Sequence, residues 1–243
     1  MCHSDESRPP AAPNHGNIGT RGDLVLTASD GTVLDAYEAH PEAPSSLGML
    51  ILPDIRGLHR YYKELADRFA EAGFHAVAID YYTRTAGRGD RSESFDFRPH
   101  WQQSTPMAVD ADALAGAEHL RAAGVTSLFS VGFCFGGTNS WRQSASIPGL
   151  AGAIGFYGRP DGVLAVEDDL RAPLLLLLGG ADPSIDPASF DDMLERLAAR
   201  GIETERHVYE GAPHSFFDRS FDEHAAACED AWSRILAFTS RHA

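Results

Sequence analysis

The stretch Ser127-Leu-Phe-Ser-Val-Gly-Phe-Cys-Phe-Gly-Gly137 decides how the chain folds. It begins with an apolar run typical of a buried strand, and the helix-compatible segment Thr138–Ala145 follows it. Gly132 and Gly136 flank Cys134, and a side chain at either glycine would collide with neighbouring chain in a sharp strand-to-helix turn. The pattern predicts a nucleophile elbow with Cys134 at its tip, where the positive end of the helix favours the thiolate. The alternative is a glycine-rich strand end around an inert buried cysteine.

Length and composition indicate one globular domain. The chain has 243 residues, of which 43% are hydrophobic and 23% are charged. The net charge of −15, from 20 basic and 35 acidic side chains, argues against nucleic-acid binding and means that an anionic substrate would need local arginines. Cys2, Cys134 and Cys228 form no CxxC pair, so we expect free thiols and a reduced, cytoplasmic setting. The first residues lack the apolar core of a signal peptide, and no apolar run is long enough to span a membrane, so we expect no membrane contact.

The order of the expected elements indicates the fold class. Residues 1–20, rich in proline, serine, asparagine and glycine, are expected to form a mobile tail, and residues 21–243 a single domain. Two strands joined at Asp30-Gly31 form an antiparallel hairpin, and the later strands alternate with helices, which predicts a mostly parallel sheet with helices on both faces. The stretch 83–106 lacks periodicity and is expected to be a lid or binding loop. We expect strands at 23–28, 32–39, 47–52, 75–79, 128–133, 150–157, 173–178 and 203–209, and helices at 61–72, 107–123, 138–145, 187–200 and 222–240.

Two residues at later strand ends could activate the thiol. Asp182 follows the strand at 173–178, and His214 follows the strand at 203–209. A thiolate nucleophile needs a base and a group that orients the base, and the order Cys134, Asp182, His214 is that of α/β-hydrolases. Taken singly, Asp182 could be a turn residue before proline, with Asp186 as a rival, and His214 a surface histidine.

The same fold predicts an oxyanion hole made of backbone N–H groups. We expect one donor from Phe135, which follows the nucleophile, and one from Ile55, in the loop after the strand at 47–52. The alternative for Ile55 is simple packing of its loop. The histidines form no HExxH motif and no i, i+4 pair, so we expect no metal, and no glycine-rich nucleotide-binding motif is present.

These residues resemble a known family. Gly132-Phe-Cys-Phe-Gly-Gly, Asp182, Gly211-Ala-Pro-His-Ser-Phe and Pro53-Asp-Ile-Arg-Gly57 are similar to the corresponding motifs of the dienelactone hydrolases (carboxymethylenebutenolidases), and the likeness runs from about residue 24 to the C-terminus. The resemblance implies hydrolysis of the enol-lactone 4-carboxymethylenebut-2-en-4-olide to maleylacetate, during catechol or chlorocatechol breakdown, through an acyl-enzyme on Cys134. It implies no cofactor and a small-molecule lactone or ester as partner.

The resemblance also implies an auxiliary acid and substrate-binding residues. A family glutamate that contacts the resting cysteine corresponds here to Asp54, which is one methylene shorter; the alternative is that Asp54 caps its own loop. The family's substrate arginines match less directly: Arg219 lies near one position, and Arg98 or Arg84 near the other. Trp101 could form a wall of the pocket.

Two other functions stay open. The protein could be a broader carboxylesterase or thioesterase for other small activated esters, because the arginine positions differ from the family pattern. It could also be a ligand-binding protein that kept the fold and lost the chemistry. The oligomeric state is expected to be a monomer or a homodimer.

Overall fold

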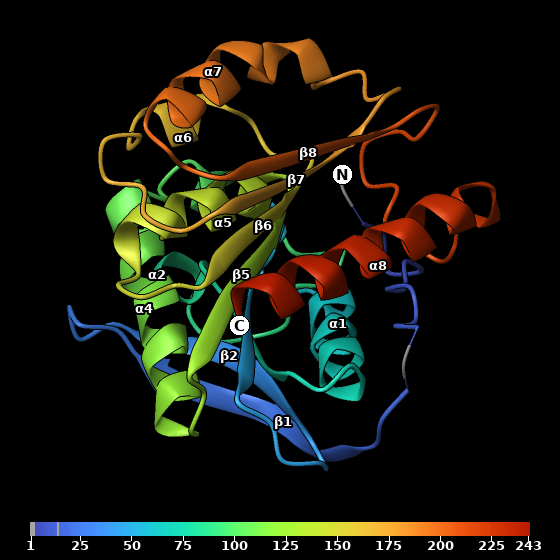
Figure 1. Ribbon diagram of the computed structural model, residues 1–243. Helices are drawn as coiled ribbons and strands as arrows, with labels where there is room; N and C mark the ends of the chain where they lie inside the picture. Colours follow the sequence, from blue (N-terminus) through green and yellow to red (C-terminus); the bar gives the residue numbers. More distant parts are fainter. Residues whose placement is uncertain (1–2, 14) are drawn as a thin grey trace.

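The computed structural model describes residues 3–13 and 15–243, and an eight-stranded sheet forms the centre of this part of the chain (Figure 1). The strand order is β1-β2-β4-β3-β5-β6-β7-β8; β2 pairs antiparallel with β1 and β4, and all other neighbours are parallel. This confirms the predicted α/β-hydrolase class with a mostly parallel sheet. The strands are β1 (Ile18–Thr27), β2 (Val33–Pro41), β3 (Leu47–Leu52), β4 (His75–Ile79), β5 (Ser127–Phe133), β6 (Gly152–Phe156), β7 (Leu174–Gly179) and β8 (Thr204–Tyr209).

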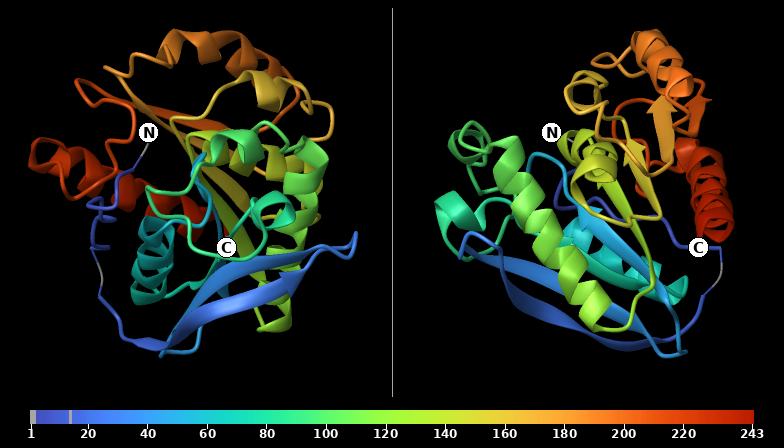
Figure 2. Two further views of the ribbon diagram at one scale, coloured as in Figure 1. Left: turned by 180° about the vertical axis from the view of Figure 1, so that it is seen from behind. Right: turned by 60° about the vertical axis from the view of Figure 1, so that its left-hand side comes forward.

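Helices cover both faces of the sheet, as the alternating pattern predicts (Figure 2). Helices α1 and α8 pack on one face, and α4 and α5 pack on the other. Short helices occur within the stretch 83–106, in which the sequence shows no periodicity. The helices are α1 (Arg60–Glu71), α2 (Thr83–Ala86), α3 (Arg98–Trp101), α4 (Pro106–Ala122), α5 (Phe135–Ser146), α6 (Asp161–Leu164), α7 (Asp191–Ala199) and α8 (Ala225–His242), with 3₁₀ turns η1 (Pro187–Phe190) and η2 (Asp222–His224).

The central strands are buried on both faces, which is why they appear in the sequence as continuous apolar runs. Every residue of β7 is buried. On the α5 side, the Trp141 indole lies over Gly155 and donates a hydrogen bond to the Leu175 carbonyl at 2.9 Å; a Cβ at Gly155 would lie 2.3 Å from the ring. On the other side, the ring of Phe238 from α8 lies 6.4 Å from that of Phe129. Within the described residues, no helix has the length and apolar character needed to cross a lipid bilayer.

The N-terminal arm, defined here as residues 3–13, differs from the sequence prediction of a mobile tail. It runs beside α1 and α8 and packs against the domain (Figure 1). His3 is 2% exposed and stacks on Tyr61 with ring centroids 3.8 Å apart. The Trp232 indole of α8 donates a hydrogen bond to the Pro10 carbonyl at 3.2 Å. Composition alone could not reveal this packing, because the partners of the arm lie 50 or more residues away along the chain.

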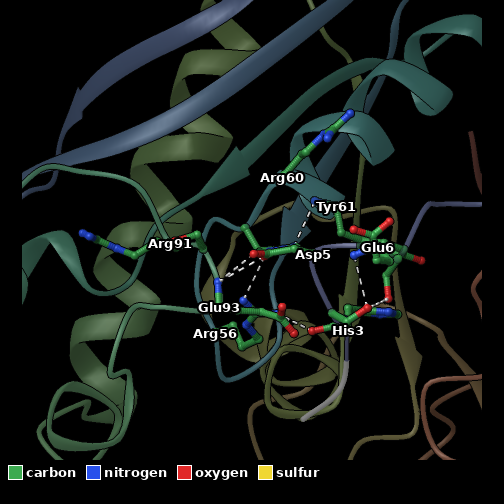
Figure 3. A network of polar contacts seen from close by, with 12 residues as sticks. His3, Asp5, Glu6, Arg56, Arg60, Tyr61, Arg91 and Glu93 are labelled. Carbon is green, nitrogen blue, oxygen red and sulfur yellow. Dashed lines mark hydrogen bonds and ion pairs between the residues drawn. The ribbon is translucent and has the colours of Figure 1, made fainter.

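The contacts of the N-terminal arm reach the loop between β3 and α1 (Figure 3). The buried Arg56 guanidinium donates hydrogen bonds to the His3 carbonyl and, at 3.4 Å, to the Asp5 carboxylate. The same carboxylate lies 2.7 Å from His59 Nε2 and accepts from the Glu93 backbone N–H at 3.1 Å. Asp5 therefore joins the β3–α1 loop to the long 83–106 stretch.

Candidate active site

Cys134 lies on a strained turn between β5 and α5. Its backbone has φ 55° and ψ −113°, a conformation that side-chain-bearing residues rarely adopt. The turn is possible because a Cβ at Gly132 would lie 1.9 Å from the Gly136 carbonyl oxygen, and one at Gly136 would lie 2.0 Å from that of Leu52. The Cys134 N–H donates to the Phe156 carbonyl at 3.0 Å, which fixes the turn to the neighbouring strand. The two glycines thus have the steric role that the sequence indicated.

Asp182 and His214 come together from the loops that follow β7 and β8. His214 Nδ1 lies 2.5 Å from Asp182 Oδ2, and the Asp182 side chain is only 1% exposed. The other carboxylate oxygen, Oδ1, accepts a hydrogen bond from the Ser184 backbone N–H at 2.7 Å. Both oxygens are therefore engaged, and the carboxylate holds the imidazole in one orientation. The rival Asp186 instead caps η1 by accepting from the Ala188 N–H at 2.9 Å.

His214 is coupled electrostatically to the thiol. Burial lowers the pKa of His214, but hydrogen bonding and charge interaction with Cys134 and Asp182 outweigh this and raise the pKa above its usual value. The Tyr157 ring lies against the imidazole, with centroids 4.8 Å apart. Tyr157 itself has φ 38°, so strained backbone occurs at this strand end as well.

A cavity of about 630 Å³ brings the expected residues together. Its lining includes Cys134 and His214, both oxyanion candidates and one aromatic side chain from the 83–106 stretch: Ile55, Trp101, Cys134, Phe135 and His214. Phe135 is the first residue of α5, so its N–H has no acceptor within the helix. The Ile55 carbonyl accepts from the Tyr82 hydroxyl at 2.6 Å, which holds its loop. Among the described residues, groups with metal-ligand spacing lie away from this cavity.

Asp54 is completely buried, and one of its oxygens caps its own loop. Oδ1 accepts a hydrogen bond from the Arg56 N–H at 2.8 Å, which is the alternative considered for this residue. Within the described part of the chain, Oδ2 has no hydrogen-bond partner, and Asp54 is not part of the cavity lining. Its role as auxiliary acid stays a prediction.

The three arginines expected to bind substrate lie away from the cavity. Arg84 is bound to two carboxylates, with its Nη2 2.7 Å from Asp112 and its Nη1 2.6 Å from Asp30. Arg98 is exposed and is absent from the cavity lining. Arg219 lies in a separate surface groove beside the N-terminal arm. Their positions differ from the prediction because a long arginine side chain pairs with the nearest carboxylate or extends into solvent. Sequence spacing does not specify which of these partners lies within reach.

Two other arginines line the cavity instead. Arg142 on α5 is 7% exposed, with long contacts of 3.3 Å to Asp110 and 3.4 Å to the Gly162 carbonyl. Within the described residues its Nε makes no hydrogen bond. Arg159 lies three residues beyond the end of β6 and is exposed. The position of Arg159 just after a strand could have marked it as a cavity residue from sequence. Arg142 lies in the middle of a helix, so the sequence offered no such signal for it.

The chain is similar to proteins of one family. The profile of the dienelactone hydrolase family matches residues 34–243. A relative from Escherichia coli strain K12, named "Putative carboxymethylenebutenolidase", is 29% identical over 259 residues, covering 96% of this chain and 94% of the relative. A relative of the same name from Methylorubrum extorquens is 31% identical over 232 residues, covering 88% and 78%. A crystal structure named "Putative Dienelactone Hydrolase" from Klebsiella pneumoniae has a TM-score of 0.73 and 28% identity, covering 91% of this chain and 99% of that chain.

Proposed function

Because this chain belongs to the dienelactone hydrolase family, we propose that it hydrolyses small enol-lactones or activated esters through an acyl-enzyme on Cys134. The observation that carries the proposal is the convergence of three strand ends on one cavity. Cys134 and His214 both line that cavity, and Asp182 holds the imidazole through a 2.5 Å contact. This arrangement supplies a nucleophile, a base and an orienting carboxylate within one site.

In the first step the Cys134 thiolate attacks the lactone carbonyl carbon. The new C–S bond forms as the carbonyl oxygen becomes an oxyanion, which the N–H groups of Phe135 and Ile55 stabilise. When the oxyanion collapses, the ring C–O bond breaks and the enol oxygen leaves with a proton from His214. The raised pKa of His214 supports this role, because a protonated imidazole beside the thiolate can act as the acid.

In the second step water releases the acid product. Neutral His214 takes a proton from water, and the resulting hydroxide attacks the thioester carbonyl. The C–S bond then breaks and the sulfur leaves as the thiolate, so the protein returns to its starting state. Asp182 Oδ2 stabilises the imidazolium formed in this step, and no cofactor is required.

Arg142 and Arg159 support a substrate that carries a carboxylate. The net charge of −15 repels anions, so a negative substrate needs local cations at its binding site. The Arg142 guanidinium is nearly buried at the cavity wall and only weakly paired, which leaves it available to a carboxylate. The finer proposal is therefore hydrolysis of 4-carboxymethylenebut-2-en-4-olide to maleylacetate, by a cytoplasmic monomer or homodimer.

A broader carboxylesterase or thioesterase is the second candidate. It is favoured by the positions of Arg84, Arg98 and Arg219, which all lie away from the cavity that the substrate acid would enter. In that case the cavity would accept uncharged acyl groups, and Arg142 would serve only to hold α5 against Asp110.

Kinetics on matched substrates distinguishes the two. We expect a higher kcat/KM for the charged lactone than for an uncharged aryl ester, and we expect Arg142→Met and Arg159→Met each to lower the lactone value by roughly 10- to 100-fold while changing the ester value little. Arg98→Met is the matched control, because this exposed arginine is outside the cavity. Equal effects on both substrates, or no preference for the lactone, would exclude the carboxylate-binding proposal.

A further inference from the structure

A cluster of three histidines and one glutamate lies on the sheet face covered by α4. Glu38 and His40 occupy alternate positions of β2, and the side chains of alternate strand residues point to the same face. His75 is the first residue of β4 and is next to His40 in the antiparallel register that pairs Ala39 with Ala76. His119 comes from the last turn of α4. Because β4 begins here and the active site lies at the other ends of the parallel strands, the cluster is remote from Cys134.

Contacts at hydrogen-bond distance link the four side chains in a row, from His119 through Glu38 and His40 to His75. Glu38 Oε2 lies 2.7 Å from His119 Nε2 and 3.0 Å from His40 Nε2. His40 Nδ1 lies 2.7 Å from His75 Nδ1, and His75 Nε2 lies 3.2 Å from the Ser45 carbonyl oxygen. The side chains are partly exposed, at 17% for His40, 29% for Glu38 and 31% for His119. One edge of the cluster is therefore open to solvent.

Without a metal these contacts require one extra proton. The Ser45 carbonyl only accepts, so His75 carries a proton on Nε2, and the Glu38 carboxylate only accepts, so His40 carries one on Nε2. With one proton on each ring, the 2.7 Å contact between the two Nδ1 atoms therefore has no donor.

A bound cation would remove this requirement. If His40 Nε2 coordinates a metal, His40 carries its proton on Nδ1 and donates it to His75 Nδ1, while His75 Nε2–H still donates to Ser45. Both rings are then neutral and every contact is satisfied. A histidine ligand whose other ring nitrogen donates to a fixed acceptor is the usual outer-shell arrangement of protein metal sites.

We propose that Glu38, His40 and His119 bind a divalent transition-metal ion of the zinc class, with His75 orienting His40. Their ligand atoms all lie within 4.8 Å of one another. Tetrahedral zinc bonds of about 2.0–2.1 Å place neighbouring ligand atoms about 3.3 Å apart, so the contacts of Glu38 with the two histidines would open by a few tenths of an ångström. The open edge leaves the fourth position to water. Two imidazoles and one carboxylate suit zinc, cobalt, nickel or copper better than magnesium or calcium.

The site would join three separate elements, because its ligands come from β2 and α4 and its orienting histidine from β4. No metal-binding motif marks the site in the sequence, since residues 38, 40, 75 and 119 match none. The metal site does not depend on the proposed hydrolase function, and disproof of that function would not affect it.

Zinc titration by calorimetry tests the proposal in a Cys134→Ala background, which removes the cavity thiol as a competing ligand. We expect one zinc ion per chain and the loss of this binding in His119→Ala and Glu38→Gln. His75→Phe should weaken binding by roughly 10- to 100-fold, because it removes the orienting acceptor. His242→Ala is the matched control, since it disrupts the other group with ligand spacing, Glu203, Glu205 and His242, and should leave the affinity unchanged.

Cobalt binding gives a second readout. Cobalt in place of zinc should give the visible absorption bands of a four-coordinate ion. No zinc binding in the parent protein, or unchanged affinity in His119→Ala or in His75→Phe, would overturn the proposal.

Discussion

Replacing Asp182 by asparagine should inactivate the protein by fixing the wrong tautomer of His214. The Ser184 N–H donates to Asp182 Oδ1 at 2.7 Å, so in the variant this position must hold the amide oxygen. The amide nitrogen then occupies the Oδ2 position, 2.5 Å from His214 Nδ1, and donates to it. His214 must therefore carry its proton on Nε2, where it can no longer accept a proton from water.

The size of the effect follows from this geometry. Loss of a charge-assisted hydrogen bond alone costs about 1.5–3 kcal/mol, or roughly 10- to 150-fold in rate. Blocking the general base through the tautomer costs about 10⁴-fold in a serine–histidine–aspartate triad, which corresponds to about 5.5 kcal/mol. Asp182→Ala makes no hydrogen bond to His214, so the imidazole can choose its tautomer. We therefore expect Asp182→Asn to be the less active of the two variants.

Steady-state and single-turnover hydrolysis of an activated ester by the two variants provides the assay. Thermal unfolding and circular dichroism serve as the folding control, because Asp182 is buried and the alanine variant leaves a small cavity. An asparagine variant that is as active as the alanine variant, or more active, would refute the assignment of Asp182 as the orienting acid.

Three further predictions concern stability and thiol reactivity. Arg91→Met should lower the free energy of unfolding by about 3–5 kcal/mol, because it removes the arginine that forms the buried ion pair with Asp80 at 2.8 Å. The double variant with Asp80→Asn should recover part of this loss in urea unfolding. Iodoacetamide should modify Cys134 faster than Cys228, since Cys228 is 3% exposed and burial raises its pKa to about 11; equal rates by peptide mass spectrometry would contradict an activated thiol. The pKa of His214 is raised in the fold, so its protonation stabilises the protein below about pH 6.5, and this contribution disappears as the pH rises through the folded-state pKa. His214→Phe should therefore reduce the difference between the free energies of unfolding at about pH 6 and at about pH 9.

Much of the fold and the positions of three candidate site residues could be predicted from local sequence. The strand at 47–52 and the strand at 75–79 have the predicted bounds, because a strand buried on both faces is a continuous apolar run whatever its neighbours are. The proximity of Cys134, Asp182 and His214 could be predicted because each follows a strand, and the carboxyl ends of parallel strands lie at one edge of a sheet.

The features that could not be predicted from the sequence depend on contacts that form only in the folded state. The N-terminal arm packs because Arg56 and Trp232 offer it hydrogen bonds, and neither residue is marked as a partner by its local sequence. Arg84 was predicted to bind substrate, but in the fold its guanidinium forms ion pairs with Asp30 and Asp112. The helix residue Arg142 became a cavity residue only because α5 starts at the elbow and runs along the site.

Intact-protein mass spectrometry after rapid mixing with an activated ester tests the central claim most directly. The account predicts a transient added acyl mass that maps to the peptide containing Cys134, and neither adduct nor turnover in Cys134→Ala. Undiminished hydrolysis by Cys134→Ala, or turnover by the parent protein with the acyl group found on a different residue, would contradict it.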